Sequence, residues 1–495
     1  MNYSVYESKE DRIVHRRVIP TGKEEGVEEL LLLPTKIEAE GVENADCLLL
    51  PRPAQLIYSD ATPFARVDSG ATLILDFGEE QNGGVRIFTD SVPVGATVRV
   101  RFGESYAEVC ANLGEKNATN DHAVRDVTLP LSAYAETAFG TTGYRYVRLD
   151  FSSPGELFLK NVYGTCRILC KKPQYVCPET GLIGEIYHAA KRTVDLCCTD
   201  YVVDGIKRDR LVWVGDMHPE MLALTTLYGR CESLERSLDL AREATPLPRF
   251  MNNFPTYSIW WVIILADYYP YASAEFFARQ KDYFTGLIAQ LSACVSESGE
   301  ISLPHYFFDW QTHESEEEKT GVAALFLLAA KKAKELFAHY GLSEEPAKEL
   351  ISRLQKKPIP QSRKKQVIGM KYLAQGFLSQ EEKDALIAGG AQGMSTFMSY
   401  YILHAVASFA PEKAVEMMKE YYGAMLALGA TSFWEDFSLQ WTENAAPITR
   451  LAQRGEVDVH GDFGAYCYLG YRHSLCHGWA TGVLRFLKEQ FPSKG

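Results

Sequence analysis

The sequence predicts two parts of different fold class, an N-terminal antiparallel β-sandwich over residues 1–175 and a helical (α/α)6 barrel over residues 176–495. Three observations support this division. Short segments of alternating apolar and polar residues dominate before residue 170, and helical periods dominate after about residue 178. All seven tryptophans lie at or beyond Trp213. The 495 residues also exceed the length of one typical domain, so two folding units are expected.

The alternating segments of the first part are typical of strands with one buried and one exposed face. Turn residues rich in glycine and proline separate them, including those at 82–84 and 152–155. Short strands at this spacing favour an antiparallel sandwich. We expect the first 50 residues or so to be extended or to add a strand region. The predicted strands span residues 72–77, 85–90, 97–103, 145–151 and 156–164.

The second part contains twelve segments with the period of amphipathic or buried helices. This is more than a simple bundle holds, and no repeat is strong enough to indicate a solenoid. A closed double ring, with six helices inside and six outside, is the economical way to bury so many. The predicted helices span residues 182–199, 218–227, 233–244, 258–269, 274–296, 316–340, 345–356, 366–376, 379–388, 395–407, 411–428 and 475–490.

Composition excludes several classes of function. The formal net charge of −13 argues against a nucleic-acid partner, because phosphate binding requires a basic surface. The sequence has no run of about 18 apolar residues that would indicate a membrane span, and its first residues lack the apolar core of a secretory signal. We therefore expect a cytoplasmic protein without a membrane partner, either a monomer or a homodimer.

The eleven cysteines do not indicate a metal site. They are scattered and odd in number, whereas a structural zinc site requires two closely spaced pairs. Reduced thiols in a cytoplasmic protein explain this pattern better. We expect no metal and no other cofactor.

The segment YVVDGIKRDRLVWVGDMHPE, residues 201–220, carries the strongest functional signal. Its acids lie among basic residues and one tryptophan, without the periodicity of a helix or a strand. Carboxylates beside guanidiniums and an indole suit a site that cleaves sugars, because acids protonate a leaving oxygen or activate water while an aromatic face covers the ring. The segment is therefore interpreted as an active-site loop. Its charged and aromatic residues are Asp204, Lys207, Arg208, Asp209, Arg210, Trp213, Asp216 and Glu220.

Four further clusters combine aromatic residues with acids or histidines. The flat face of a sugar stacks on aromatic rings, and carboxylates accept the hydrogens of its hydroxyls. Glu435 lies 226 positions after Asp209, which two loops of one ring can bridge and a local salt-bridge motif cannot. The clusters are 254–269 with Trp260 and Trp261, 303–314 with Asp309 and Trp310, 429–447 with Trp434 and Glu435, and 460–482 with His473, His477 and Trp479.

Several of these residues also have a purely structural interpretation. Asp216 fits a helix N-cap, with Pro219 in the first turn. One of the neighbouring Trp260 and Trp261 belongs in the core, because successive residues of a helix face different directions. The other structural alternatives are an ion network of Arg208 and Arg210 with Asp204 and Asp209, and a structural role for His473.

Together these residues resemble the signature of the bacterial α-L-rhamnosidases of glycoside hydrolase family 78. The run DGIKRDRLVWVGD, residues 204–216, is similar to the family's sequence of an Asp, a short turn, Arg, an acidic residue and Leu-x-Trp-x-Gly-Asp. The family's Gly-Ala-Thr-Thr-x-Trp-Glu and Ser-Leu-x-His blocks match residues 429–435 and 474–477, and its Asp-Trp pair matches Asp309-Trp310. These blocks cover nearly all of the helical part. The first part resembles, less specifically, the β-sandwich that precedes the family's barrel.

The resemblance implies an inverting glycosidase that releases terminal non-reducing α-L-rhamnose from small rhamnosides or oligosaccharides. It implies Asp209 as the general acid and Glu435 as the general base that activates water. Inversion requires these two carboxyls to lie about 6.5–9.5 Å apart. The implied sugar-binding residues are Asp204, Arg208, Trp213, Asp216, Trp261, Asp309, Trp310, Trp434 and His477.

Two departures from the family pattern leave alternatives open. The family's acid is usually Glu, and Asp209 is shorter by one methylene, about 1.5 Å, where a misplacement of about 1 Å can cost 10²-fold in rate. The sequence also ends without the C-terminal β-domain of many relatives, which favours small, already imported rhamnosides over polymers. The alternatives are a catalytically weak or inactive rhamnoside-binding relative, and an (α/α)6 hydrolase that acts on a different sugar such as a uronic-acid oligosaccharide.

Overall fold

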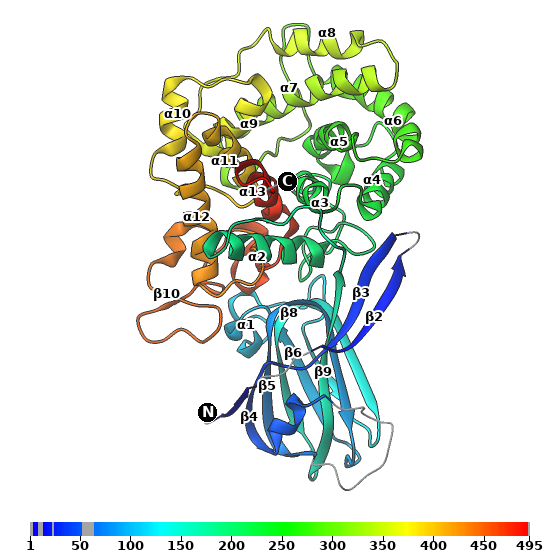
Figure 1. The fold of residues 1–495 in the computed structure, drawn as a ribbon, viewed down its shortest axis with the longest axis vertical. Helices are drawn as coiled ribbons and strands as arrows, with labels where there is room; N and C mark the ends of the chain where they lie inside the picture. Colours follow the sequence, from blue (N-terminus) through cyan, green and yellow to red (C-terminus); the bar gives the residue numbers. More distant parts are fainter. Residues whose placement is uncertain (1–2, 8–12, 22–23, 52–63, 494–495) are drawn as a thin grey trace.

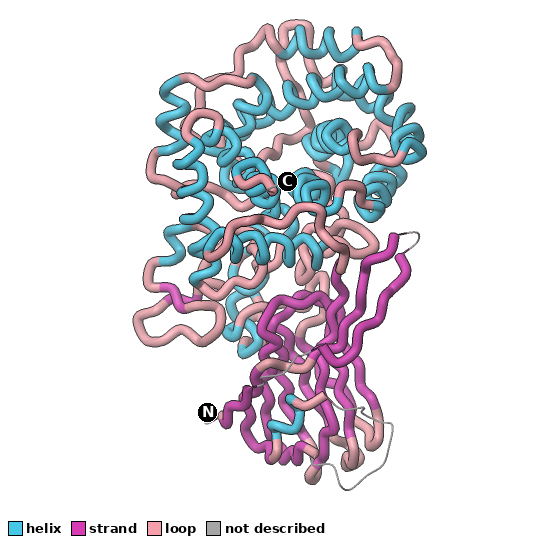
Figure 2. Tube along the Cα trace, viewed as in Figure 1, coloured by secondary structure: helices cyan, strands magenta, loops and turns pink. Residues whose placement is uncertain are grey.

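The structure, a computed structural model, describes residues 3–7, 13–21, 24–51 and 64–493. Strands and helices segregate into two parts of the molecule, as Figure 2 shows, so the predicted fold class is confirmed. The chain passes from the strands to the helices between β9 (Leu157–Leu169) and α2 (Leu182–Cys197).

One sheet in the N-terminal part, antiparallel except where β5 pairs with β9, folds back on itself to form two layers. Its strand order is β2-β3-β9-β5-β8-β6-β7, and β4, which also pairs with β1, joins it at β5. Residues 72–76 of β5 (Ala65–Thr89) pair with β4 and β8, whereas residues 85–88 pair with β8 and, in parallel, with β9. The remaining strands are β1 (Ser4–Glu7), β2 (Ile13–Thr21), β3 (Glu24–Leu32), β4 (Lys36–Glu43), β6 (Thr97–Gly103), β7 (Asp126–Pro130) and β8 (Glu136–Ser152).

The two strands predicted at 72–77 and 85–90 are a single bent strand, β5. The turn residues between them bend the chain without reversing it. Gly83 is required in this bend, because a Cβ there would overlap the carbonyl oxygen of Thr165. The first 50 residues contain β1 to β4 where the structure describes them, and residues 1–2, 8–12 and 22–23 lie outside the described residues.

The two layers enclose one apolar core. Side chains alternate between buried and more exposed positions at the start of β6, as the sequence pattern predicts: Val98 and Val100 are buried, whereas Thr97 and Arg99 are half-buried. Leu196, Ile206 and Cys476, all from the helical part, complete this core. The two parts of the molecule are therefore packed against each other.

Six helices of the C-terminal part form a closed inner ring, in which each packs against the next and the last returns to the first. The other six lie outside them (Figure 1). This arrangement is the predicted (α/α)6 barrel. The inner helices are α3 (Met217–Tyr228), α5 (Pro255–Tyr268), α7 (Glu316–His339), α9 (Lys365–Gln375), α11 (Ser399–Ala407) and α13 (Val483–Gln490); the outer ones are α2, α4 (Glu232–Ala244), α6 (Ala274–Ala293), α8 (Glu345–Leu354), α10 (Gln380–Ile387) and α12 (Pro411–Ala427).

All twelve predicted helices are present in the continuously described residues 64–493, together with the short α1 (Tyr106–Cys110) of the β part. The last begins at Val483 and not at residue 475. The residues before Val483 do not form helical hydrogen bonds, because the N–H of His477 donates to the carbonyl of Phe433 and the N–H of Gly478 donates to the carbonyl of Asp204. A 3-10 turn, Gly478–Gly482, then leads into α13.

Two of the inner helices, α3 and α5, are buried along almost their whole length because both of their faces are covered. Every residue of α3 is buried, whereas α8 of the outer ring buries only one face. Among the helices that the structure describes, none combines the length and the apolar composition needed to cross a membrane.

Candidate active site

Four loops that run from an outer to an inner helix meet at one end of the barrel. They precede α3, α7, α11 and α13. Ser395 before α11 donates to Asp309 before α7 at 2.9 Å, and the N–H of Gly478 before α13 donates to the carbonyl of Asp204 before α3 at 2.6 Å. Residues far apart in the sequence therefore share one site.

Arg208 connects the two carboxyls that the sequence singles out. Its Nη1 lies 3.2 Å from Oδ1 of Asp209, and its Nη2 donates to Oε1 of Glu435. Because both carboxyls contact one planar guanidinium, they lie within about 8 Å of each other. Burial lowers the pKa of Arg208, but Glu435 and Asp209 outweigh it and raise this pKa above its usual value.

Glu435 is buried and firmly held. It is 1% exposed, and its Oε2 accepts from the backbone N–H of Ser474 at 3.2 Å. Its own carbonyl accepts from the indole of Trp479 at 2.7 Å. Its other oxygen, Oε1, accepts from the guanidinium of Arg208, so both oxygens of the side chain are held. Asp209, by contrast, is partly exposed at the edge of the site.

Asp204, Asp216 and His477 form a second buried group, with one polar atom of each within 4.8 Å of the others. Burial raises the pKa of Asp204, and Asp216 adds to this effect; burial and then Glu435 raise the pKa of Asp216. Burial lowers the pKa of His477. The group thus favours neutral acids and a neutral imidazole, which can donate to and accept from hydroxyls.

Asp216 stands at the N-cap position of α3, but its side chain does not cap the helix. It accepts from the hydroxyl of Tyr257 at 3.3 Å instead. Arg210 does not form the predicted structural network, since it donates to the carbonyl of Ile206 at 3.0 Å and to that of Thr141. The structural interpretation is correct for His473, whose Nε2 accepts from the backbone N–H of Asp436 at 2.9 Å.

A small aromatic cavity lies beside Asp216 and Asp309. Its volume of about 10 Å³ has room for about one water molecule. Burial raises the pKa of Asp309 to about 7. The lining residues are Gly215, Asp216, Tyr257, Trp260, Phe307, Phe308, Asp309, Trp310, Phe397 and Trp479.

The predicted placement of Trp261 in the sugar site is wrong. Trp261 is 0% exposed and packs on Tyr283 of α6, with ring centroids 5.4 Å apart. Its neighbour Trp260 lines the cavity. Both residues belong to α5, and since neighbours on a helix point in different directions, only one of them faces the interior of the ring.

The other predicted tryptophans lie at different depths. Trp310 lines the cavity and stacks on Tyr466, with ring centroids 5.0 Å apart. Trp213 is half-buried and packs edge-on to Tyr257. Trp434 is buried in the helical core, edge-on to Phe437, and is not among the residues that line the cavity.

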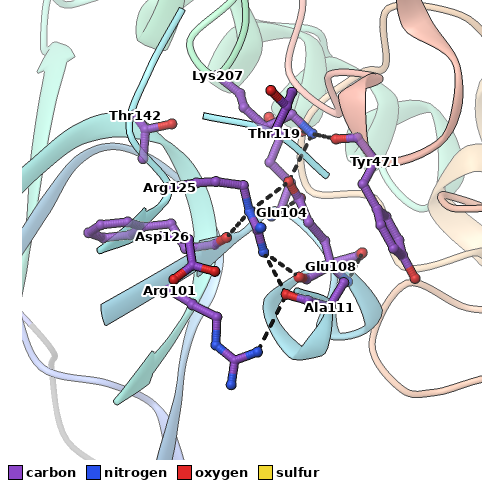
Figure 3. A network of polar contacts seen from close by, with 12 residues as sticks. Arg101, Glu104, Glu108, Ala111, Thr119, Arg125, Asp126, Thr142, Lys207 and Tyr471 are labelled. Carbon is purple, nitrogen blue, oxygen red and sulfur yellow. Dashed lines mark hydrogen bonds and ion pairs between the residues drawn. The ribbon is translucent and has the colours of Figure 1, made fainter. Parts of the chain in front are cut away.

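A buried ion cluster from the β part supports the loop before α3 (Figure 3). The ammonium of Lys207 lies 3.0 Å from Glu104 and 3.3 Å from Glu108, and it donates to the carbonyl of Tyr471 at 2.9 Å. Glu104 also accepts from the N–H of Leu475 at 2.6 Å. The sequence gives no sign of this role for Glu104 and Glu108, since nothing local in residues 104–108 signals a partner near residue 207.

Among the residues that the structure describes, two groups of acids and histidines have the spacing of metal ligands. In Glu104, Glu108 and His460 the ammonium of Lys207 lies among the ligand atoms and supplies the positive charge itself. The other group consists of Asp204, Asp216 and His477, whose uncharged forms are favoured by burial, and it lies beside Glu435. The spacing alone does not identify a metal centre in either.

Larger cavities, of about 560 and 580 Å³, lie elsewhere on the helical part. The first contains one carboxyl, Glu300, which pairs with Lys357. Acid–base chemistry on a glycosidic bond needs two carboxyls facing one space, which the first cavity lacks. The second is lined by Glu381 and Asp384, but both are exposed acids of the one helix α10, and it contains none of the acids singled out by the sequence motifs.

No family model and no curated protein sequence matches the chain. Solved structures do match it. The family 78 glycoside hydrolase rhamnosidase of Bacillus sp. GL1 is 19% identical with a TM-score of 0.67, over 89% of this chain and 48% of its own. The rhamnosidase of Klebsiella oxytoca with rhamnose bound is 18% identical with a TM-score of 0.69, over 98% and 96% of the two chains. The Streptomyces avermitilis α-L-rhamnosidase complexed with L-rhamnose is 15% identical with a TM-score of 0.64, over 84% and 42%.

The chain therefore has the fold of these glycoside hydrolase structures, a β domain followed by a helical barrel. More particularly, it has the fold of the rhamnosidases, as the resemblance in the sequence implies. It spans about half the length of the Bacillus protein and nearly all of the Klebsiella protein. At identities below 20% this likeness establishes the fold, and the chemistry has to come from the site.

Proposed function

We propose that the protein is an inverting glycoside hydrolase that releases terminal non-reducing α-L-rhamnose from small rhamnosides or oligosaccharides. One observation carries this proposal: Asp209 and Glu435, 226 positions apart, contact the same guanidinium at one end of an (α/α)6 barrel. Two solved structures of this fold hold rhamnose. The motifs of residues 204–216 and 429–435 support the same sugar.

In this mechanism Glu435 takes a proton from a water molecule as the water oxygen attacks the anomeric carbon. Asp209 gives its proton to the glycosidic oxygen as the bond from that oxygen to the anomeric carbon breaks. The buried, ion-paired Glu435 has the form that a base needs. The exposed edge at Asp209 is where the leaving group departs. The products are rhamnose of the opposite anomeric configuration and the free alcohol.

The rhamnose ring is expected to bind between the buried polar group and the aromatic cavity. Asp204, Asp216 and His477 offer hydrogen bonds to its hydroxyls. The cavity of about 10 Å³ has to widen for a hexose. The stacked pair of Trp310 and Tyr466 is the side that can move, since Tyr466 is 54% exposed at the rim.

Replacing Glu435 tests the proposal. Glu435→Gln keeps the shape of the side chain but cannot accept a proton, so kcat on p-nitrophenyl α-L-rhamnoside is expected to fall by about 10²- to 10⁴-fold. Proton NMR of the wild-type reaction is expected to show β-L-rhamnose as the first product. The control is Glu443→Gln, an exposed acid of the same loop, which should leave kcat unchanged. Retained turnover in Glu435→Gln would remove the base from the mechanism, and α-L-rhamnose as the first product would exclude inversion.

A rhamnoside-binding protein of little catalytic activity is the second candidate. The short acid at Asp209 and the small cavity favour it. Calorimetry that detects L-rhamnose binding, with no release of nitrophenol by the wild type, would support this candidate over hydrolysis.

A further inference from the structure

A small polar cavity lies between the β part and the barrel, lined by Arg125 from the loop before β7 and by Arg208 from the loop before α3. Figure 3 shows the surroundings of Arg125. The volume of this Arg125–Arg208 cavity, about 10 Å³, admits a single species of about the size of water. The loop that carries Arg125 also brings Nε2 of His122 to 3.2 Å from Oδ1 of Asp209. The cavity is therefore close to the candidate active site but separate from it.

Each of the two arginines has one nitrogen left for the cavity. Nε of Arg125 donates to the carbonyl of Phe102, and Nη2 donates to those of Glu108 and Ala111. Its Nη1 is buried and has no hydrogen-bond partner among the described residues. Arg125 is 3% exposed, so bulk water does not solvate this nitrogen. A buried donor without an acceptor destabilises the folded state, and a ligand of the cavity would remove that cost.

Arg208 is left with a free donor in the same way, but on another edge of its guanidinium. Its Nη1 and Nη2 contact Asp209 and Glu435. Its Nε is buried without a partner in the described part of the chain, and the residue is 6% exposed. A guanidinium has no acceptor atom, so these two nitrogens cannot satisfy each other. Both require a ligand that accepts hydrogen bonds.

The charges around the cavity favour an anion as that ligand. Its lining contains two acids, and each already has a basic partner: Glu108 lies 3.3 Å from Lys207, and Asp121 lies 2.6 Å from Arg472. Arg125 is left with a share of Glu108, at 3.8 Å. Burial lowers the pKa of Arg125 despite this acid. The charge of Arg125 is thus poorly compensated for a buried cation.

We propose that the Arg125–Arg208 cavity is a halide site, in which a chloride ion accepts hydrogen bonds from Nη1 of Arg125 and Nε of Arg208. The volume excludes phosphate and carboxylate ligands, which have several heavy atoms. A water molecule fits and can accept from both nitrogens, but it brings no charge to Arg125. The ion would lie one side chain away from the two proposed catalytic carboxyls, behind Arg208. The inference does not depend on the reaction, because it concerns binding alone.

Diffraction with bromide tests the position of the ion. Bromide replaces chloride and scatters anomalously, so crystals of the wild-type protein in sodium bromide are expected to show an anomalous peak between Arg125 and Arg208. Density at this position without an anomalous peak would mean an ordered water only and would overturn the inference. This measurement needs no variant and no rhamnoside, so its result is independent of whether the protein hydrolyses a sugar.

Thermal unfolding tests whether chloride binds in solution. Sodium chloride is exchanged for sodium methanesulfonate at constant ionic strength, which keeps screening equal while the larger anion cannot enter the cavity. The midpoint of unfolding is expected to rise by about 2 °C with chloride and to saturate, since an ion that binds only the folded state stabilises it. A midpoint that is the same in both salts would overturn the inference. A bromide peak with no such rise would mark an adventitious ion only, with the same consequence.

Arg125→Gln links the two readouts to the site. It removes the charge and Nη1, so the rise with chloride and the bromide peak are both expected to disappear. Arg86→Gln is the matched control, at a half-buried arginine that pairs with Glu136 and does not line the cavity, and it should keep both. A chloride effect that survives in Arg125→Gln would place the ion elsewhere and overturn the proposal. If Arg125→Gln does not fold, the two wild-type measurements decide.

Discussion

At the scale of single residues, burial determines the charge of the acids in this site. Asp309 has no basic partner among the described residues, and its one side-chain donor is Ser395 at 2.9 Å. Burial raises the pKa of Asp309 to about 7 and that of the neighbouring Asp436 to about 6. Each of these groups costs stability when it ionises in the folded protein.

Asp309→Asn is expected to change how stability depends on pH. The folded state binds the Asp309 proton more tightly than the unfolded state, so wild-type stability falls as pH rises from about 4 to about 7, while the amide of the variant does not titrate. At about 1.4 kcal/mol per pKa unit, the difference in free energy of unfolding between variant and wild type should shift by up to about 4 kcal/mol in favour of the variant as pH rises over that range. Urea unfolding at pH 4, 5.5, 7 and 8 measures this difference.

Asp282→Asn, at an exposed acid of α6, is the control for this measurement and should show no such gain. A difference between wild type and Asp309→Asn that is the same at every pH would contradict the account, because only a titrating group produces the slope.

At the scale of elements, the loops that lead from the outer to the inner ring supply the residues of the candidate site. They are packed so closely that even a small added side chain would displace a neighbour. Gly215 lies just before α3, and a Cβ there would overlap the ring of Tyr257. Tyr257 is itself packed against Trp213, Phe254 and Phe307, and it donates to Asp216. Displacing this ring therefore disturbs the start of the helix and the carboxyl together.

Gly215→Ala is expected to cost about 1–3 kcal/mol of stability, since the packed ring has to shift. On the proposed function it should also raise KM for p-nitrophenyl α-L-rhamnoside about 10-fold, because Asp216 loses its fixed partner. Urea unfolding and initial rates measure the two effects. Gly155→Ala is the matched control, as the nearest atom to its added Cβ is 3.6 Å away. Wild-type values of both quantities in Gly215→Ala would show that Tyr257 is not held in place.

At the scale of the whole molecule, the two parts are joined by charge as well as by apolar packing. Lys207 of the barrel lies between two acids of the β part, Glu104 and Glu108. Burial alone would lower the pKa of Lys207, but these acids outweigh it and raise that pKa above its usual value. Even beside Lys207, burial raises the pKa of Glu104 to about 7.

Lys207→Met is expected to lower the free energy of unfolding by about 3–5 kcal/mol, because it removes the buried cation that faces both carboxyls and leaves Arg125 as the basic partner of Glu108. Adding Glu104→Gln in the same chain should recover part of this loss. Urea unfolding at pH 8 measures both variants. Lys348→Met removes an exposed ion-paired lysine and should leave the free energy of unfolding close to that of the wild type. If Lys207→Met behaved like Lys348→Met, the cluster would not join the two parts.

Much of the fold follows from local pattern. The twelve helices are predictable because the 3.6-residue period of apolar side chains is visible within each segment. The strands of residues 97–103 and 156–164 follow in the same way from alternation. The bend that makes residues 65–89 one strand is not predictable, because a turn signal does not say whether the chain reverses.

The residues proposed for the chemistry, Asp209, Glu435 and Arg208, are recognisable in the sequence by residue type and by neighbouring motif. The contacts of these residues with other parts of the chain depend on the tertiary structure. In the folded chain Trp260 lines the cavity and Trp261 does not. Lys207 lies between Glu104 and Glu108, and His122 lies against Asp209. The physical reason is range: periodicity and turn chemistry act over a few residues, whereas contacts between loops depend on how the ring of helices closes and where the sandwich packs against it.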